Sequence, residues 1–445
     1  MNLRGWLRPG MGIKRWLFLV FIGELCLALG GAFLLRQLYR DADVAGPLQG
    51  VFYALTLQFI PYGLRALIVG TIGLVLFVVG SLRVIRAIMD PFRSADADQP
   101  LVELIYQKRF LARGPRIVAI GGGTGLSTLL RGLKEHSSNL TAVVTVADDG
   151  GSSGKLREQL GVPAVGDIRN CIVALADAEP IMAELLQYRF PETDRTGSAA
   201  DSTTLGGHAV GNLLIAALTA IQHGDFEEGV RQMNHVLAVR GQVLPVSPTP
   251  IVLHGRLADG SVVDGQSKLA RAAGIEQVWV SPDDIEPSDD AIRAISDAEV
   301  IVLGPGSLYT SILPSLLLPA IRDAVRASSA LRVYVCNVAT QAGETAGYDL
   351  ADHIDAIARH TAPGLVDVVL ANNHVAGHGT DQFLGQPVAL RWPPTGPDAP
   401  RLVLDDIVDP AEPHFHDPVR LAAALLRVIE RERPARRRAG VARSA

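Results

Sequence analysis

Residues 117–125 read IVAIGGGTG, and residues 143–154 read VVTVADDGGSSG. Each stretch is a short apolar run that ends in a glycine-rich loop, and a helical pattern follows the first loop. A glycine-rich turn between a strand and a helix lets backbone N–H groups approach a phosphate at the positive end of the helix. Two such loops close together in the sequence predict a nucleotide site.

The chain from residue 116 to about residue 430 continues this alternation of apolar runs and helical patterns. Parallel strands joined by helical crossovers produce it, so we predict an α/β fold with a Rossmann-like, doubly wound, mostly parallel sheet. A hairpin pattern at residues 251–263, centred on Ala258-Asp259-Gly260, predicts a small antiparallel insertion. The strand candidates are residues 117–120, 142–146, 278–280, 300–303, 332–336 and 366–370. The helix candidates are residues 126–135, 168–176, 181–188, 208–222, 225–237, 291–295, 315–327 and 351–360.

The composition is that of a globular protein with an additional apolar part. The chain has 445 residues, 48% hydrophobic and 20% charged, with a net charge of −5. This length can bury a large core. The mild charge excludes a broad basic surface, and basic residues do not alternate with aromatic ones, so nucleic-acid binding is not expected. Three distant cysteines, Cys26, Cys171 and Cys336, form no metal pattern and suit a reducing compartment.

Two apolar stretches near the N-terminus, residues 17–35 and 66–82, are long enough to span a bilayer. Basic residues precede the first stretch and follow the second, and the positive-inside rule then places both ends in the cytoplasm. We predict a transmembrane hairpin of two helices at residues 1–89, with both termini and the main domain cytoplasmic. A cleaved signal peptide is the alternative for the first stretch, but no clear cleavage site follows it. The role of Glu24 within the first span stays open.

The remaining boundaries follow from these features. We predict a linker at residues 90–114, a Rossmann-like ligand-binding domain at residues 115–430, and a basic, disordered tail at residues 431–445. A contact of the tail's arginines with anionic lipid is the alternative.

The first loop, Gly121-Gly122-Gly123-Thr124-Gly125, is not the G-x-G-x-x-G dinucleotide fingerprint, because Leu126 stands in place of the last glycine. Its position between a strand and a helix nevertheless favours a ligand site over a purely structural turn. Thr124 is a residue type that could cap the helix.

Asp148 and Asp149 follow the second strand. In a dinucleotide fold an acidic residue near this place holds a ribose. Beside phosphates, two adjacent carboxylates could instead hold magnesium, a hard cation that prefers oxygen ligands. A surface Asp-Gly turn is the structural alternative, but the long run of glycine and serine that follows favours a site.

Further polar groups fall at helix starts and at the ends of later strands. Arg169 could pair with a phosphate or an aspartate, although its neighbour Asp167 could simply be a helix N-cap. His208 and Asn212 stand four residues apart and would share one face of a helix. Because open α/β sheets bind ligands at the carboxyl ends of their strands, we expect one cleft there. Its predicted ligand-binding residues are Gly121, Gly122, Gly123, Thr124, Gly125, Asp148, Asp149, Arg169, His208, Asn212, Gly304, Gly306, Ser307 and Asn337.

Five motifs, in this order, resemble those of the gluconeogenesis factor family (YvcK-like), in the superfamily of 2-phospho-L-lactate transferase (CofD). The motifs are residues 121–127, 148–154, 166–170, 208–212 and 304–311. The resemblance implies a Rossmann-like fold, binding of UDP-N-acetylglucosamine, and a role in carbon flux and cell-wall morphogenesis. The transferase branch instead uses a guanosine-diphospho-lactyl donor and magnesium.

We therefore expect a membrane-anchored regulatory protein that binds a nucleotide-diphosphate sugar and links carbon flux to cell-wall synthesis and cell shape. The alternative is a magnesium-dependent transferase in which Asp148 and Asp149 are catalytic and bind the metal. The sequence establishes no cofactor, and Mg²⁺ is the candidate that the paired aspartates suggest. Whether the protein forms a homo-oligomer stays open, because nothing in the sequence sets the oligomeric state.

Overall fold

The computed structural model describes residues 110–177, 180–192, 205–373, 385–392 and 399–443, and in the N-terminal part residues 21, 24, 25, 28, 31, 32, 59–61, 64, 68, 71 and 75. The chain divides into two compact units, residues 1–110 and 111–445. Among the described residues, no helix is both long and apolar enough to cross a bilayer. The predicted hairpin at residues 1–89 lies almost wholly outside the described residues and stays a prediction.

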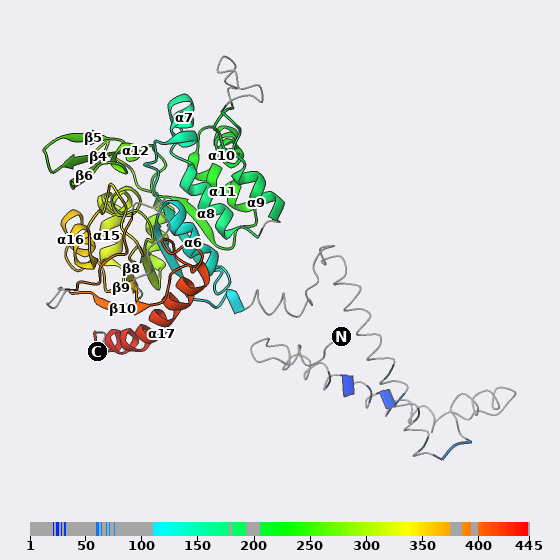
Figure 1. Ribbon diagram of the computed structural model, residues 1–445. Coiled ribbons are helices and arrows are strands. Elements are labelled where there is room, and N and C mark those ends of the chain that lie inside the picture. Colours follow the sequence, from blue (N-terminus) through cyan, green and yellow to red (C-terminus); the bar gives the residue numbers. More distant parts are fainter. Residues whose placement is uncertain are drawn as a thin grey trace. The chain divides into compact units, whose positions relative to one another are not determined.

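The second unit is built on a seven-stranded sheet in the order β10-β9-β8-β7-β1-β2-β3, with all neighbouring strands parallel (Figure 1). The predicted α/β fold with a mostly parallel sheet is thereby confirmed. All five residues of the central strand β1 are buried, as expected for a strand covered on both faces. The strands are β1 (Ile117–Gly121), β2 (Leu140–Val144), β3 (Gln242–Pro245), β7 (Val300–Leu303), β8 (Leu331–Val335), β9 (Val368–Asn372) and β10 (Arg401–Asp405).

Helices cover both faces of this sheet. The crossover from β1 to β2 through α6 (Gly123–Leu133) moves one way along the sheet, and the crossover from β7 to β8 through α14 (Leu313–Leu316) and α15 (Pro319–Ala327) moves the other way. Since such crossovers are right-handed, these helices lie on opposite faces. Helix α8 (Gly166–Leu175) and the C-terminal helix α17 (Pro418–Arg443) pack against α6.

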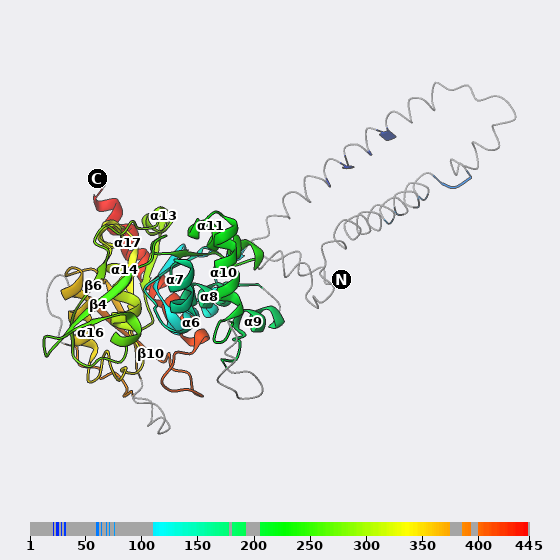
Figure 2. The ribbon, with the colours of Figure 1, turned by 90° about the horizontal axis from the view of Figure 1, so that it is seen from above.

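The remaining helices lie at the two ends of the unit. In both views, α9 (Pro180–Gln187), α10 (Val210–Ile221) and α11 (Phe226–Val236) lie at one end, and α16 (Leu350–His360) lies at the other (Figure 2). Helices α7 (Gly151–Leu160), α12 (Gln266–Leu269) and α13 (Asp289–Asp297) complete the set, with a π-helical turn at Leu308–Ile312.

The predicted antiparallel insertion is present as a three-stranded sheet in the order β5-β4-β6. Its strands are β4 (Val252–Leu257), β5 (Val262–Asp264) and β6 (Ile275–Ser281). The strand predicted at residues 278–280 belongs to this small sheet and not to the parallel one. Strands β3 and β10 were not predicted, because β3 is four residues long and ends in proline, and β10 is an edge strand that mixes charged and apolar residues.

The C-terminal segment differs from the prediction of a disordered tail at residues 431–445. Helix α17 continues through the basic stretch to Arg443. Arginine and alanine have high helix propensities, so an established helix is readily extended through this sequence.

The packing of α17 on α6 depends on Gly132. A Cβ atom placed there would lie 1.9 Å from the carbonyl oxygen of Pro418 and 2.8 Å from the Cβ of Ala422. We expect Gly132→Val to displace α17 and to lower the free energy of unfolding by roughly 1–3 kcal/mol, the usual cost of overpacking. Urea denaturation measures this loss. The exposed neighbour Arg131 provides the control: Arg131→Ala should change stability by less than about 0.5 kcal/mol, and equal effects of the two variants would contradict the packing argument.

Candidate functional site

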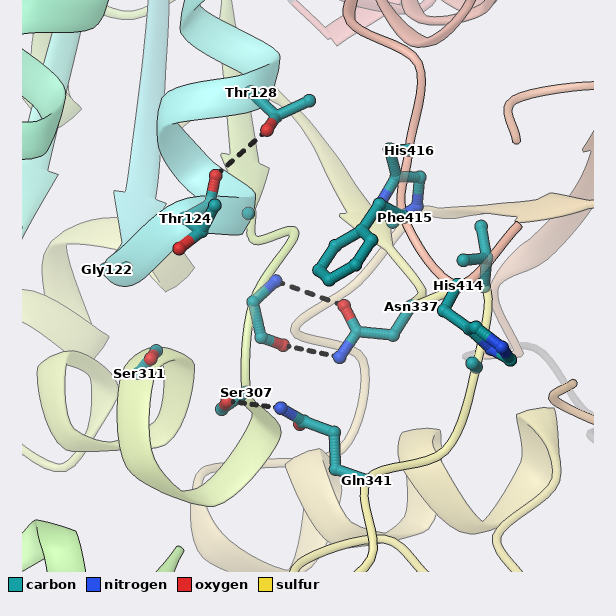
Figure 3. A pocket seen from close by; sticks show the side chains of 15 residues that line it. Gly122, Thr124, Thr128, Ser307, Ser311, Asn337, Gln341, His414, Phe415 and His416 are labelled. Carbon is teal, nitrogen blue, oxygen red and sulfur yellow. Dashed lines mark hydrogen bonds between the residues drawn. The ribbon is translucent and has the colours of Figure 1, made fainter. Parts of the chain in front are cut away.

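The glycine loop after β1 (residues 121–125) and a second glycine loop after β7 (residues 304–307) meet where the strand order changes direction, between β1 and β7. The strands that follow β1 are added on one side of it, and the strands that follow β7 are added on the opposite side. The loops at the carboxyl ends of β1 and β7 therefore diverge and leave a crevice between them. A pocket of about 210 Å³ occupies this place and is lined by residues from both loops (Figure 3). The structure thus brings together Gly122, Gly123, Thr124, Gly125, Gly306, Ser307 and Asn337 of the predicted site.

Glycine is required at position 125, where the two loops that line the pocket touch each other. A Cβ atom at Gly125 would lie 2.8 Å from the carbonyl oxygen of Pro305 and 3.1 Å from the Cα of Gly306. Real Cβ atoms do not come this close to backbone oxygen, and neither backbone can move without shifting a central strand. The missing side chain at Gly125 therefore sets the distance between the two loops.

The N-terminus of α6 faces the pocket. The helix begins at Gly123, and its N-cap is Gly122, which has no side chain of its own to cap it. Thr124 therefore does not cap the helix, contrary to the prediction, because the turn is one residue tighter than the pattern suggested. The first turn carries no acidic residue of its own, so the positive end of the helix dipole is directed at the pocket.

Two amide side chains hold the second loop in place (Figure 3). Asn337 accepts a hydrogen bond from the Gly306 N–H at 3.2 Å and donates one to the Gly306 carbonyl at 3.0 Å. Gln341 donates from Nε2 to the Ser307 hydroxyl at 2.7 Å, while its buried Oε1 has no hydrogen-bond partner within the described part of the chain. Asn337 thus positions the loop, and Gln341 retains an acceptor for a ligand.

The C-terminal segment before α17 closes one side of the pocket, and sequence reasoning missed it. Its residues His414, Phe415 and His416 line the pocket. Phe415 is 44% exposed, whereas His416 is buried and hydrogen-bonds through Nε2 to the Cys336 carbonyl at 3.2 Å. Burial lowers the pKa of His416 to about 4, so the ring is neutral at pH 7. No local pattern marks this segment, which follows an unpredicted strand. Thr128, Ser311 and Gln341 also line the pocket.

Asp148 and Asp149 are directed at different elements. Asp148 accepts a hydrogen bond from the Gly150 N–H at 2.9 Å. Asp149 accepts one from the Ser267 N–H at 2.8 Å and so binds the start of α12 in the insertion. Asp149 therefore connects the insertion to the loop after β2, and only Asp148 is directed toward the start of α8, where a Cβ at Gly166 would lie 3.2 Å from its Oδ2.

The acidic neighbour of Asp148 is Asp167, which is not the N-cap of α8, because Val165 occupies that position. The Asp167 carboxyl lies against the first glycine loop: a Cβ at Gly122 would come within 2.4 Å of its Oδ2, and the Gly123 N–H donates to it. Burial, together with the charge of Asp148, raises the pKa of Asp167 to about 7. Burial also raises the pKa of Asp148. The structure thus places one carboxyl group with a raised pKa, that of Asp167, against the first glycine loop, and a second, that of Asp148, beside the start of α8.

A buried polar network continues from this acidic pair. Arg169 donates to Asn212 Oδ1 at 3.0 Å, and its Nε has no hydrogen-bond partner among the described residues. Asn212 donates to the Ser152 hydroxyl at 3.0 Å, and His208 Nδ1 lies 3.2 Å from the same oxygen. His208 precedes α10, so the two residues do not share a helix face as predicted, but both meet at Ser152. Burial lowers the pKa of His208, which keeps its ring neutral at pH 7.

The predicted magnesium site has a limited set of ligands. Among the described residues, no group of three or more histidine, cysteine, aspartate or glutamate side chains could hold a metal. Asp149 is already bonded to α12. Asp148 and Asp167 could still supply one or two carboxylates, and Mg²⁺ commonly completes such a set with phosphate oxygens and water. The residues therefore fit a magnesium ion that arrives with a phosphate ligand.

The raised pKa of Asp167 predicts a pH dependence of stability. The unfolded chain releases this proton near pH 4 and the folded chain near pH 7, so this group's contribution to the free energy of unfolding falls as the pH rises between these values. Asp167→Asn removes the titration. As the pH rises from about 4 to about 7, the free energy of unfolding of this variant should increase by up to about 4 kcal/mol relative to that of the wild type. Urea denaturation at a series of pH values measures this difference.

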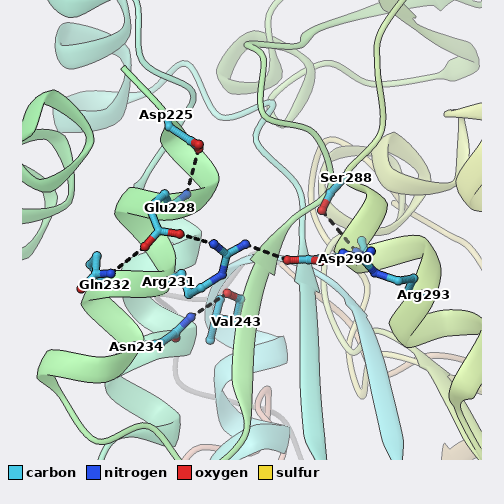
Figure 4. A network of polar contacts seen from close by, with 10 residues as sticks. Asp225, Glu228, Arg231, Gln232, Asn234, Val243, Ser288, Asp290 and Arg293 are labelled. Atoms are coloured by element: carbon cyan, nitrogen blue, oxygen red, sulfur yellow. Dashed lines mark hydrogen bonds and ion pairs between the residues drawn. The ribbon is translucent and has the colours of Figure 1, made fainter. Parts of the chain in front are cut away.

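Asp290 on α13 provides a control of opposite sign. Figure 4 shows it between Arg293 and Arg231, the latter at 2.9 Å, and these arginines lower the pKa of Asp290. Its contribution to stability is present above the unfolded pKa and is lost as the pH falls. Asp290→Asn should therefore be destabilising at neutral pH and approach the wild type in acid. A pH-independent difference for Asp167→Asn would refute the assignment of Asp167 as a neutral carboxyl.

Comparison with known proteins identifies the family. Residues 117–382 match the family described as 2-phospho-L-lactate transferase CofD. A "Putative gluconeogenesis factor" of Nostoc sp. is 42% identical over 95% of this chain and 91% of its own length. The gluconeogenesis factor of Bacillus subtilis is 47% identical over 59% of this chain and 80% of its own length.

A solved structure agrees with these matches. The crystal structure of a member of the UPF0052 family from Bacillus halodurans is 41% identical, covers 70% of this chain and 99% of its own, and superposes with a TM-score of 0.63. The resemblance seen in the five motifs is thereby confirmed, and the chain belongs to the gluconeogenesis factor family, within the CofD family.

Proposed function

We propose that this protein is a regulatory protein that binds a nucleotide-diphosphate sugar, with UDP-N-acetylglucosamine as the ligand, and that it links carbon flux to cell-wall synthesis and cell shape. The pocket between β1 and β7 is the observation that carries the proposal. Two glycine loops and the N-terminal end of α6 meet there, an arrangement that suits a diphosphate.

The lining of the pocket suits the rest of such a ligand. Hydroxyl groups of Thr128, Ser307 and Ser311, with the buried Oε1 of Gln341, can bond sugar or ribose hydroxyls. Phe415 offers an apolar ring at the open side. Sites for small molecules commonly combine a few placed polar groups with such apolar surface.

Calorimetry with the full-length chain tests the ligand. UDP-N-acetylglucosamine should bind saturably, and Asn337→Ala should weaken the binding about thirtyfold, because two hydrogen bonds to Gly306 are lost and each contributes about 1 kcal/mol. Asn234→Ala is the matched control: Asn234 also donates to a backbone carbonyl, that of Val243 at 2.9 Å, but lies on α11 (Figure 4). The absence of saturable binding at millimolar ligand would refute the proposal.

The second candidate function is a magnesium-dependent transferase, favoured by the match to the transferase family and by the Asp148–Asp167 pair. Mg²⁺ would supply charge neutralisation at a phosphate there. Measuring nucleotide consumption in the same samples separates the two functions. A transferase would consume the nucleotide only when Mg²⁺ is present and would not do so in the Asp148→Ala variant. A regulatory protein would bind the nucleotide without consuming it.

We also propose that residues 1–89 anchor the protein in the membrane with the domain on the cytoplasmic side, near cell-wall synthesis. The support is the sequence of the two apolar stretches. The native chain should stay in the membrane fraction after an alkaline carbonate wash, and a chain that lacks residues 1–89 should be released. Release of the full-length chain by the wash would contradict the anchor.

A further inference from the structure

The small antiparallel sheet carries a serine, a histidine and an aspartate that are joined in one line of hydrogen bonds. His254 of β4 lies in the middle of this line. Its Nδ1 is 2.6 Å from Oδ1 of Asp264, the last residue of β5, and its Nε2 is 2.7 Å from Oγ of Ser281, the last residue of β6. Asp264 and Ser281 stand 10 and 27 positions from His254, so the pairing of the strands brings the three side chains together.

The strand register places these side chains on the outer face of the sheet. His254 pairs with Asp264 on one side and with Trp279 on the other, and Ser281 lies two residues after Trp279. Side chains two residues apart in a strand share a face. Helix α12 covers the opposite face, because a Cβ atom at Gly255, the next residue of β4, would lie 2.3 Å from a leucine side chain of α12. The line of Ser281, His254 and Asp264 therefore faces away from α12.

The two hydrogen bonds fix the state of the histidine ring. A carboxylate has only acceptor atoms, so Nδ1 of His254 donates its proton to Asp264. In the neutral ring Nε2 is then an acceptor, and the Ser281 hydroxyl donates to it. The ring is also stacked on Trp279, with 5.5 Å between the ring centroids and 13° between the planes, and the His254 side chain is only 19% exposed. His254 is thus held as a base directed at one hydroxyl.

This order of groups is the one that activates a serine as a nucleophile. The serine hydroxyl donates to an imidazole, which in turn donates to a carboxylate that orients it. Both distances lie within the range of about 2.6–3.2 Å expected for such pairs. Ser281 is partly exposed, and its Oγ makes no other hydrogen bond within the described part of the chain. A substrate from solution can therefore reach it.

The residue after the serine limits the class of substrate. In serine hydrolases the N–H of the residue after the nucleophile commonly stabilises the oxyanion of the intermediate. Pro282 occupies that position here and has no N–H. With less stabilisation of the oxyanion, attack by Ser281 requires an ester with a good leaving group. Trp279, on the same face, provides adjoining aromatic surface for a planar leaving group.

We propose that Ser281, His254 and Asp264 form a hydrolytic site for activated carboxylic esters, separate from the pocket between β1 and β7. Ser281 Oγ attacks the carbonyl carbon while His254 Nε2 takes the hydroxyl proton. The bond from this carbon to the leaving oxygen breaks, and the leaving group departs as an alcohol with that proton. Water then attacks the acyl-serine in the same way, His254 returns the proton to Ser281, and the carboxylic acid leaves.

Two measurements on the full-length chain in detergent test the site. The chain should hydrolyse p-nitrophenyl acetate faster than buffer does. A fluorophosphonate, which reacts with activated serines, should label the chain, and peptide mass spectrometry should place the label on Ser281. Ser281→Ala should abolish this label, and His254→Ala should lower the rate of hydrolysis about a hundredfold, the usual contribution of a general base.

Ser261→Ala is the matched control. Ser261 lies beside β5 in the same insertion, but its hydroxyl donates to the carboxylate of Asp259 at 2.6 Å instead of to an imidazole. This variant should keep the rate and the labelling of the wild type. Circular dichroism on all variants checks that the fold is kept.

The same experiments can overturn the proposal. A wild-type chain that the fluorophosphonate does not label at Ser281 would do so. Ester hydrolysis that is no faster in the wild type than in Ser281→Ala, or that Ser281→Ala and Ser261→Ala lower equally, would also do so.

Discussion

The close approach of two backbone loops is the constraint on which the rest of the site depends. Adjacent parallel strands β1 and β7 bring their carboxyl ends to one edge, and the absence of a side chain at Gly125 lets the loop after β1 touch Pro305 in the loop after β7. Any Cβ there would force apart two strands that are buried on both faces. The size of the pocket and the direction of α6 both follow from this contact.

The first glycine loop also joins the pocket to a second, acidic region. Gly122 lies directly against Asp167, and the Gly123 N–H donates to the Asp167 carboxyl. Burial favours the protonated form of this carboxyl near neutral pH. The protonated carboxyl is uncharged, so it repels an anionic ligand in the neighbouring pocket less than a carboxylate would. A site for a diphosphate can therefore contain acidic groups, provided that burial keeps one of them neutral or a cation accompanies the ligand.

Helix α10 connects the site to the surface of the protein. Its inner face holds Asn212, which bonds Arg169 and Ser152 in the acidic region. Its outer face carries the exposed side chains of Leu214 and Ile221.

The sequence by itself determined most of the helices and strands, the family, and the positions of the glycine-rich loops along the chain. Hydrophobic runs and helical periodicity predicted the parallel strands and most helices, because both patterns depend on neighbours within a few residues. Only the tertiary structure decided which side chains meet: Asp167 with the first glycine loop, Asp149 with the start of α12, His208 and Asn212 at Ser152, and Phe415 at the pocket. These contacts join residues far apart in the chain, and their partners are set by strand order and loop packing, which leave no periodic trace in the sequence.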